Sequence, residues 1–378
     1  MNIGFDYIDT LGQGGNSRYS RNLLLALSEI DRHNKYYLYG YFHDWLRPHK
    51  GKTWPKNFKI KPGYFSSLGL PFPTGLVNYL NQIAVRLASK VHGLQVLHFT
   101  NPLNYVPTVA KSIVTIHDLA PFHDPKWVKK PTLTFFQTKI SQVLQDSVQI
   151  IAVSHFTKQD IIEKFSLPEN KITVIHEAAD PVFYPDPDLE LIKNDFGLEK
   201  YILYVGQLQP RKNTLRLISA YALLPAEIRD EYKLALVGQA RDPEFQEQIQ
   251  RTIDKAGLKN KVLLLGRVSD EKVRKLYSST ALFVYPSLFE GFGLPILEAM
   301  QCGAPIAAAN TSSLPELVGK AGVLFDPTSL EAMTQAMETM IINQGIREKI
   351  QVEARIQVKQ FTWQEAARKT LAIYKKYE

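Results

Sequence analysis

The sequence has very little cysteine, since Cys302 is the single cysteine among 378 residues. One thiol excludes a disulfide framework within the chain and fits a reducing compartment. No apolar run reaches the ~18 residues needed to span a bilayer, and Asp6 stands where a signal peptide would carry cations. We therefore expect a cytoplasmic protein without a membrane-spanning segment.

Acidic residues are missing from the whole of 45–117, although the chain holds 37 Asp and Glu and its net charge is only +8. This stretch, the acid-free segment, carries nine Lys and Arg interleaved with aromatic residues. Cations beside aromatic rings suit an anionic membrane surface; a solvated face with ordinary core aromatics is the alternative. No nucleic-acid-binding module accompanies the charge, so nucleic acid is not an expected partner.

One helical stretch of the acid-free segment, Gly75–Val91, has an apolar stripe that we expect to pack on a sheet. The stripe consists of Val77, Leu80, Ala84, Leu87 and Val91.

The composition shows no strong bias, with 45% hydrophobic and 22% charged residues. These values exclude disordered, collagen-like and coiled-coil proteins. At about 100–200 residues per domain, the length predicts two domains. The prolines clustered between 181 and 187 mark the boundary.

Short apolar runs alternate with helix-like stretches in both halves of the chain, which predicts parallel α/β sheets. The expected strands are Asn2–Tyr7, Gln95–Phe99, Ser112–Ile116, Gln149–Val153, Ile172–Ile175, Tyr201–Val205, Tyr232–Val237, Lys261–Leu265, Ala281–Tyr285, Pro305–Ala308 and Gly322–Phe325. Helices are expected at Arg18–Ile30, Thr132–Gln145 and Phe361–Glu378, among others. We predict two doubly wound, Rossmann-like domains, 1–180 and 181–360, facing each other across a cleft, with helix 361–378 packing back on the first.

A basic turn follows the predicted strand Tyr201–Val205. Gly206 leaves the strand, and Arg211 and Lys212 stand where the next helix opens. Glycine lets the backbone approach a ligand, and a helix start offers N–H groups to an anion. A planar guanidinium beside an ammonium is the usual pairing for a diphosphate. We expect a phosphate site here, with a solvated basic turn as the alternative.

The segment from Glu290 to Glu298 reads Glu-Gly-Phe-Gly-Leu-Pro-Ile-Leu-Glu and follows another predicted strand. Pro295 marks the start of a helix and places Glu298 on its first turn. A carboxylate there can accept two hydrogen bonds from a vicinal diol such as a ribose, while Glu290 can face another part of the ligand. A capping or salt-bridge role is the alternative for either glutamate.

With these motifs the sequence resembles the retaining nucleotide-sugar glycosyltransferases of the GT-B type, family four or group 1, over essentially the whole chain. The frame with two glutamates separated by seven residues is intact, and Arg211 and Lys212 match the family's basic pair. Pro210–Asn213 and Thr115–Asp118 are similar to a branch that is commonly mannosyltransferase.

The resemblance implies a role for each matching residue. Arg211 and Lys212 would hold the donor diphosphate, and Glu290 would face the donor sugar. The remaining donor contacts would come from Gly15, Gly206, Val268, Phe292, Gly293, Leu294 and Glu298, the last binding the ribose. His117 would touch the sugar from the first domain; a structural role is its alternative.

The implied reaction transfers a hexose, with retention, to a glycan or lipid-linked acceptor in cell-envelope or exopolysaccharide synthesis. The expected donor is GDP-mannose, with UDP-hexoses as the alternative donors. The alternative enzyme is a sugar-nucleotide epimerase of the same fold. A NAD-dependent dehydrogenase is disfavoured, because Ser17 stands where a GxGxxG loop would have its third glycine.

We expect neither a metal nor another cofactor. His117, Asp118, His123 and Asp124 show no defined ligand spacing. Asp186-Pro187-Asp188 resembles a metal-binding triplet but lies in the proline-rich connector, so we interpret it as linker. Arg211 and Lys212 would supply the charge neutralisation that a cation otherwise provides.

Overall fold

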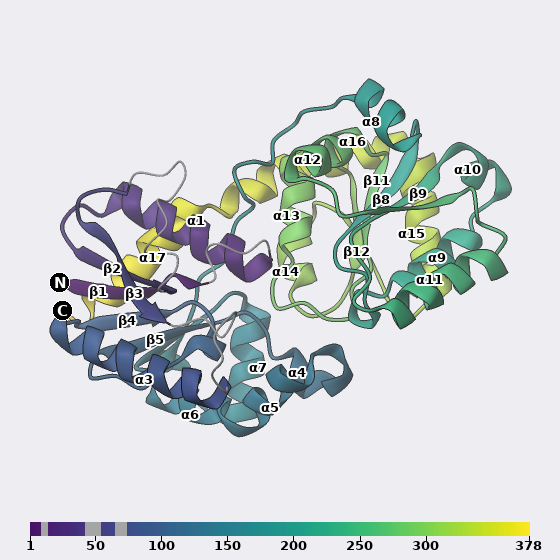
Figure 1. Ribbon diagram of the computed structural model, residues 1–378. Coiled ribbons are helices and arrows are strands. Elements are labelled where there is room, and N and C mark those ends of the chain that lie inside the picture. The colour runs from purple at the N-terminus through teal and green to yellow at the C-terminus, as the bar shows by residue number, and fades with distance from the viewer. Residues whose placement is uncertain (9–13, 42–53, 65–73) are drawn as a thin grey trace. The chain divides into compact units, whose positions relative to one another are not determined.

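The computed structural model describes residues 1–8, 14–41, 54–64 and 74–378. It contains two compact units: unit 1 is 1–177 with 362–378, and unit 2 is 178–361. Figure 1 shows both units. Of the sequence predictions, Gly12 and Gln13 of the first glycine-rich turn and residues 45–53 and 65–73 of the acid-free segment lie outside the described residues.

Unit 1 is built on a parallel sheet with the strand order β3-β2-β1-β4-β5-β6-β7. The strands are β1 (Asn2–Asp6), β2 (Lys35–Tyr41), β3 (Phe58–Tyr64), β4 (Val96–Phe99), β5 (Lys111–Ile116), β6 (Gln149–Ala152) and β7 (Ile172–Val174). The chain moves outward from β1 to β3 on one side and from β4 to β7 on the other. The order therefore reverses between β1 and β4, which is where a doubly wound sheet offers its ligand site.

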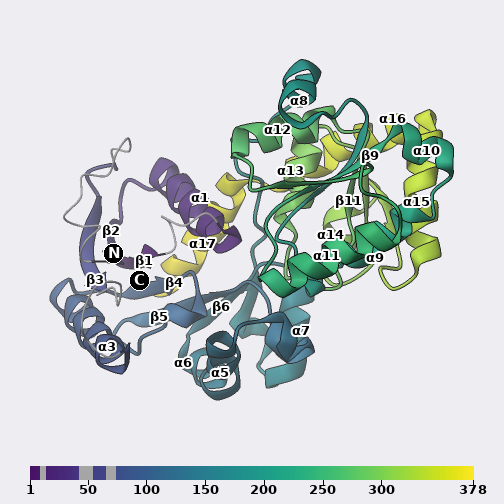
Figure 2. The ribbon, with the colours of Figure 1, turned by 45° about the vertical axis from the view of Figure 1, so that its right-hand side comes forward.

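Helices cover both faces of this sheet. Figures 1 and 2 show α1 and α17 on one face and α3, α5 and α6 on the other. The helices of unit 1 are α1 (Gly15–Ile30), α3 (Thr74–Val91), α4 (Ala120–His123), α5 (Lys130–Thr138), α6 (Ile140–Asp146), α7 (His155–Phe165) and α17 (Trp363–Lys375). The last helix returns from the end of the chain to unit 1, where the buried Tyr374 hydroxyl and Nδ1 of His98 lie 2.7 Å apart.

Unit 2 repeats the plan with the strand order β10-β9-β8-β11-β12-β13, again all parallel. The strands are β8 (Tyr201–Val205), β9 (Lys233–Val237), β10 (Val262–Gly266), β11 (Leu282–Tyr285), β12 (Ile306–Ala309) and β13 (Val323–Phe325). Here the order reverses between β8 and β11, so the loops that follow these two strands form the expected ligand site.

The helices of unit 2 also pack on both faces of their sheet. Contacts group α9 with α11 and α15, and α13 with α12, α14 and α16. The helices are α8 (Leu189–Phe196), α9 (Thr214–Ala222), α10 (Ala226–Glu231), α11 (Pro243–Lys255), α12 (Asp270–Ser279), α13 (Leu294–Gln301), α14 (Leu314–Val318), α15 (Leu330–Ile342) and α16 (Gln344–Gln357). The predicted α/β class with two doubly wound domains is confirmed. Among the described residues, no helix combines the length and apolarity that crossing a bilayer requires.

Two strands were missed, and two expectations about single elements are wrong. Strands β2 and β3 were not predicted, because β2 is mostly tyrosine and the lysines of β3 alternate with other residues. The helix expected at Thr132–Gln145 is two helices, since Lys139 leaves helical geometry with φ −125°. The stripe of α3 does not pack on the sheet as a whole: Val77 is buried, but Leu80, Leu87 and Val91 are exposed.

Two glycines bring the ends of β8 and β9 together beside the expected ligand site. The amide of Gly206 donates to the carbonyl of Val237 at 2.9 Å. A Cβ on Gly238, whose φ is +140°, would lie 1.9 Å from the carbonyl oxygen of Gly206. Only glycine at position 238 therefore allows the backbone to take this path into the expected ligand site.

We predict that Gly238→Ala lowers the free energy of unfolding of unit 2 by about 3 kcal/mol or more, because both the clash and the strained φ must be relieved. Gly257→Ala is the matched control, since Gly257 also has a positive φ, of +66°, but its Cβ would meet nothing within 4 Å. That control should cost about 1 kcal/mol. Urea unfolding followed by circular dichroism measures both, and equal losses would contradict the steric argument.

Candidate functional site

The loops that follow β8 and β11 are tied to each other at the point where the strand order of unit 2 reverses. The amide of Leu288 donates to the carbonyl of Arg211 at 2.8 Å. Asn213, in left-handed geometry with φ +60°, donates its side-chain amide to the carbonyls of Pro286 at 3.1 Å and Pro327 at 2.8 Å. These bonds fix the helical turn Pro210–Lys212 against the loop that carries Glu290.

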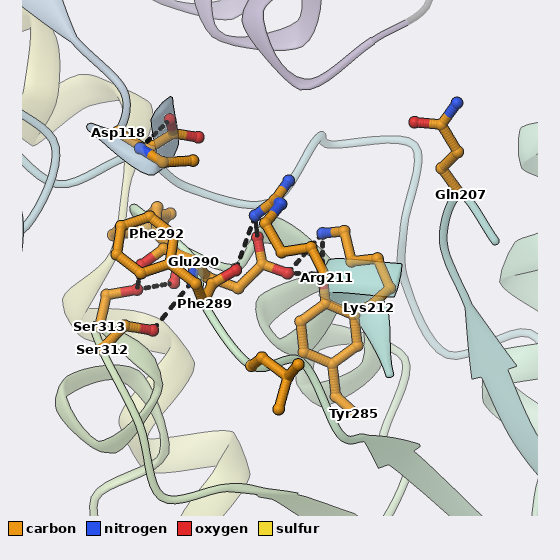
Figure 3. A network of polar contacts seen from close by, with 12 residues as sticks. Asp118, Gln207, Arg211, Lys212, Tyr285, Phe289, Glu290, Phe292, Ser312 and Ser313 are labelled. Atoms are coloured by element: carbon orange, nitrogen blue, oxygen red, sulfur yellow. Dashed lines mark hydrogen bonds and ion pairs between the residues drawn. The ribbon is translucent and has the colours of Figure 1, made fainter. Parts of the chain in front are cut away.

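The carboxylate of Glu290 lies at the centre of a cluster with Arg211, Lys212 and Tyr285, as Figure 3 shows. Its Oε1 accepts hydrogen bonds from the ammonium of Lys212 and, at 2.8 Å, from the hydroxyl of Tyr285. Its Oε2 accepts from Nη1 of Arg211 at 3.1 Å. The same Nη1 donates to the carbonyl of Phe289 at 2.6 Å, and Lys212 also donates to the hydroxyl of Tyr285 at 2.9 Å. Two cations thus share one carboxylate.

The charges of this cluster determine its protonation. Burial alone would raise the pKa of the Glu290 carboxyl, but the charges of Lys212 and Arg211 outweigh it and lower that pKa to about 2. Burial and the carboxylate together hold the pKa of Tyr285 far above its usual range, so its hydroxyl keeps its proton and donates. The cluster therefore carries one net positive charge, which suits binding of a polyanion such as a diphosphate.

The loop after β12 supports the glycine-rich bend. The amide of Glu290 donates to Oγ of Ser312 at 2.9 Å, and Oγ of Ser313 donates to the carbonyls of Glu290 at 3.0 Å and Phe292 at 2.5 Å. Gly293, with φ +119°, precedes α13 in the N-cap position and offers no side-chain cap. The first backbone N–H groups of that helix thus have no side-chain acceptor at the cap, which is the arrangement that binds anions.

The other predicted donor contacts of unit 2 occupy neighbouring positions. Gly206 lies at the carboxyl end of β8, and Val268 follows β10 in the loop before α12. Glu298 is the fifth residue of α13 and not part of its first turn, because the helix begins at Leu294. Its buried carboxylate accepts a long hydrogen bond, 3.4 Å, from the hydroxyl of Tyr277 on α12. The predicted ribose contact of Glu298 stays a prediction.

His117 follows β5 in unit 1 and has a protein partner on each ring nitrogen. Its Nε2 donates to the carbonyl of Thr100 at 2.9 Å, and its Nδ1 donates to Oε1 of Glu177 at 2.9 Å. Burial works against a charged imidazole, but the hydrogen bond and charge of Glu177 outweigh it and raise the pKa of His117 above its usual value. Acceptors at both ring nitrogens and the raised pKa therefore favour the protonated imidazole of His117 at the carboxyl edge of this sheet.

The remaining candidates of unit 1 have partners within the protein. Asp118 accepts from the amide of Ala120 at 3.0 Å, and Asp124 accepts from the amide of Lys126 at 2.9 Å. His123 lies 2.8 Å from Asp160 and so is paired away from His117. Each of these groups serves a different partner, and none of the bonds joins two of the four candidates.

Two further candidates are placed by the same structure. Gly15 is the first residue of α1, whose N-cap is Gly14 and whose first turn carries no acid. In the proline-rich connector, Asp188 caps α8 by accepting from the amide of Leu191 at 3.0 Å, and Asp186 pairs with Arg274 at 2.8 Å. The aspartates of the connector thus have structural partners within unit 2.

Unit 1 also contains a cavity of about 720 Å³. Its lining includes residues at or after the carboxyl ends of the first four strands: Ile8, Tyr41, Tyr64 and Asn104. Its volume and its mixture of aromatic, aliphatic and amide side chains are typical of a pocket for a small organic ligand.

Sequence reasoning missed four residues that build these sites. Tyr285 was counted only as the end of a buried strand, although a hydroxyl at a strand's carboxyl end is a usual ligand or support position. Ser312 and Ser313 were given no role. Glu177 follows β7 by three residues, and an acid placed there was the available signal.

The low pKa of Glu290 generates a prediction about stability and pH. Because the pKa is lower in the folded protein than in the unfolded chain, the stabilisation is present above pH 4.5 and is lost as the pH falls toward 2. Between pH 7 and pH 4 we expect the free energy of unfolding of the wild type to fall by about 1 kcal/mol more than that of Glu290→Gln. Glu247→Gln, which alters an exposed ion pair, is the control and should behave as the wild type. Circular dichroism is the readout, because unit 2 holds no tryptophan.

The pairing of His117 generates a second prediction. In Glu177→Gln the carboxylate charge is lost while burial remains, so the pKa of His117 should fall below its ordinary value of 6.5. Proton NMR titration of the imidazole measures it, with the His117→Gln spectrum giving the assignment. Glu169→Gln, on an exposed acid of the same unit, should leave the titration unchanged. An unaltered pKa in Glu177→Gln would mean that Glu177 does not hold the charge.

Comparisons with known proteins agree with this geometry. The family model of glycosyl transferases group 1 matches residues 190–357, and that of glycosyltransferase family 4 matches residues 14–183. O-antigen chain mannosyltransferase B of Escherichia coli is 32% identical over 282 residues, which cover 73% of this chain and 74% of that protein. The serotype-specific mannosyltransferase WbdA of Escherichia coli is 31% identical over 274 residues, 70% of this chain but 33% of that protein.

The fold is also found among solved structures. HepE of Anabaena, solved in complex with UDP and glucose, superposes with a TM-score of 0.78 over 100% of both chains at 19% sequence identity. The chain is 32% identical to a relative over 74% of that relative's length, and the two family models adjoin along the chain. This chain belongs to the group 1, family 4 glycosyltransferases of the GT-B fold.

Proposed function

We propose that this glycosyltransferase moves mannose from GDP-mannose, with retention at the anomeric carbon, to a hydroxyl of a glycan or lipid-linked acceptor in polysaccharide synthesis. The observation that carries the proposal is the cluster of Arg211, Lys212 and Glu290 at the carboxyl edge of unit 2. The choice of mannose is supported by the two O-antigen and serotype-specific mannosyltransferases to which the chain is similar.

Arg211 and Lys212 supply the positive charge on which the leaving diphosphate depends. As the bond between the anomeric carbon and the diphosphate breaks, charge accumulates on the phosphate oxygens, and preorganised cations stabilise it. Both cations are already held in place by Glu290 and by the carbonyl of Phe289. We therefore propose transfer without a metal ion, with this pair in the role that a divalent cation has elsewhere.

Glu290 orients the site and does not exchange a proton. A carboxyl group with a pKa of about 2 is a weak base, and both of its oxygens already accept hydrogen bonds. The acceptor oxygen then forms its bond to the anomeric carbon on the face that the diphosphate leaves. The acceptor's proton passes to a phosphate oxygen of the departing nucleoside diphosphate, so that atoms and charge balance.

The other donor contacts keep their predicted assignments within this proposal. Glu298 binds the ribose hydroxyls, Val268 lines the base pocket, and Gly15 offers its amide to the phosphates. His117 contributes a fixed positive charge and not a free N–H, since both nitrogens already donate. The cavity of unit 1 with Tyr41, Tyr64 and Asn104 would take the acceptor, because amides match sugar hydroxyls and rings match sugar C–H faces.

Two alternatives share the fold. A UDP-hexose donor is favoured by one observation, the UDP complex of HepE, although that likeness extends to the fold alone. A sugar-nucleotide epimerase would form product without an acceptor, whereas both family models that match the chain describe transferases. We also propose that the enzyme acts in the cytoplasm, which the single buried thiol of Cys302 suits.

Thermal denaturation with GDP, UDP, ADP, dTDP or NAD, in the presence of EDTA, tests the donor site. GDP at a hundredfold excess over its Kd should stabilise the protein by about 2.7 kcal/mol. The shift should be lost in Lys212→Ala and Glu298→Ala. It should persist in Lys200→Ala, which removes an exposed lysine paired with Glu231 in the same unit.

Turnover of GDP-mannose with and without an acceptor glycan then tests the reaction. We expect acceptor-dependent release of GDP that EDTA does not reduce, and a fall of about 10²–10³-fold in kcat for Lys212→Ala. Stabilisation by UDP alone would move the proposal to UDP-hexoses. Conversion of the donor without acceptor would support the epimerase, and loss of activity in EDTA would overturn metal-independent transfer.

A further inference from the structure

Helix α3 presents large apolar side chains to solvent along most of its length. It buries Val77, Val85 and Ser89, whose exposures are 2%, 0% and 0%. On the opposite side the described residues Tyr79, Leu80, Ile83, Leu87 and Val91 are 61%, 36%, 38%, 57% and 79% exposed. We call these five residues the outer face of α3.

The outer face is unusual within this molecule. Among the described residues, fifteen large hydrophobic side chains are exposed, and five of them lie on this one helix. Single exposed apolar residues are ordinary, but a contiguous group indicates a surface that something covers. At 100° per residue these five positions occupy an arc of about 120° along the helix.

Positive charge accompanies the outer face. Arg86 and Lys90 are exposed on α3, and the helix contains no acid. Nε of Arg86 donates to the carbonyl of Pro107 at 2.8 Å. Lys61 of the edge strand β3 lies close enough to lower the pKa of His92, the residue that follows α3, with burial as the larger cause. No Asp or Glu occurs in the sequence from 45 to 117. An acid from elsewhere in the chain, Asp146 of α6, lines the cavity that Val77, Asn81 and Gln82 of α3 also line.

We propose that the outer face of α3 docks on a membrane surface that contains anionic lipids, with the helix lying in the plane of the interface. Apolar side chains enter the boundary between headgroups and acyl chains, while Arg86 and Lys90 extend to the phosphates. A second copy of this chain is a poorer occupant, since an isologous contact would place two acid-free, positively charged faces against each other. The inference does not depend on the proposed transfer reaction, because it needs neither donor nor acceptor.

Flotation of the full-length protein with vesicles tests the docking without any sugar nucleotide. The probes are vesicles of phosphatidylcholine alone and of phosphatidylcholine with phosphatidylglycerol in equal parts. We expect binding to the mixed vesicles, weakening as salt is added, and little binding to phosphatidylcholine. Equal binding to both, or none to either, would overturn the proposal.

Two pairs of variants locate the surface, each with a control matched in spacing and exposure. Leu87→Ser with Val91→Ser removes apolar area, and its control is Val352→Ser with Ile356→Ser on α16, where both residues are 57% exposed. Arg86→Glu with Lys90→Glu reverses charge, and its control is Arg251→Glu with Lys255→Glu on the exposed side of α11. Each α3 pair should weaken binding to the mixed vesicles about tenfold or more, and each control should bind as the wild type.

Two further readouts separate the possible causes of a change. Thermal midpoints and the shift produced by GDP should stay at wild-type values in the α3 variants, so that a folding or donor-site defect is recognised as such. Light scattering measures the oligomeric state. If the α3 pairs changed the oligomeric state and left vesicle binding intact, the outer face would be a contact between copies of the chain and the membrane proposal would be wrong.

Discussion

The carboxylate of Glu290, held between Arg211 and Lys212, is the constraint on which the candidate donor site of unit 2 depends. The three residues come from the loops after β8 and β11. Glu290 is 78 positions from Lys212 and 79 from Arg211 along the chain, and the loops are adjacent because the strand order reverses there. Without the carboxylate, two cations of low exposure would face each other in a partly desolvated space, which is unfavourable. The pair is therefore available to an anionic ligand only because an acid of the same site keeps it in place.

Unit 1 also has a carboxylate paired with a basic side chain at the edge of its sheet. His117 and Glu177 follow β5 and β7 and make a buried pair of opposite charge at the carboxyl edge of that sheet. The two sites differ in how many hydrogen-bond donors their basic side chains have. Both nitrogens of the imidazole are engaged by Glu177 and Thr100, so His117 can act on a ligand through its charge alone. A guanidinium or an ammonium has more donors and can bind protein and ligand together, which explains why the basic pair of unit 2 is the better candidate for direct contact.

Each strand of unit 2 could be predicted, because buried parallel strands are short apolar runs bounded by loops. Both ends of each expected range lie within one residue of the observed strand. Unit 1 was predicted less completely, since β3 is an edge strand whose Lys59 and Lys61 alternate with apolar residues. The motif around Glu290 was visible in the sequence, but its partner Tyr285 and its supports Ser312 and Ser313 were not. Their roles follow from which loops meet at the sheet edge, and local sequence carries no such information.

Helix α3 shows why periodicity alone could not identify its buried face. The helix has apolar residues on nearly every side, so more than one stripe satisfies the helical spacing. The side that packs inward carries the smaller residues Val85, Ala88 and Ser89, which let the helix axis approach the strands closely. The larger Tyr79 and Leu87 would hold the axis away and leave space unfilled. The helix therefore packs with its smaller residues inward, and the bulky residues of the outer face stay exposed to solvent.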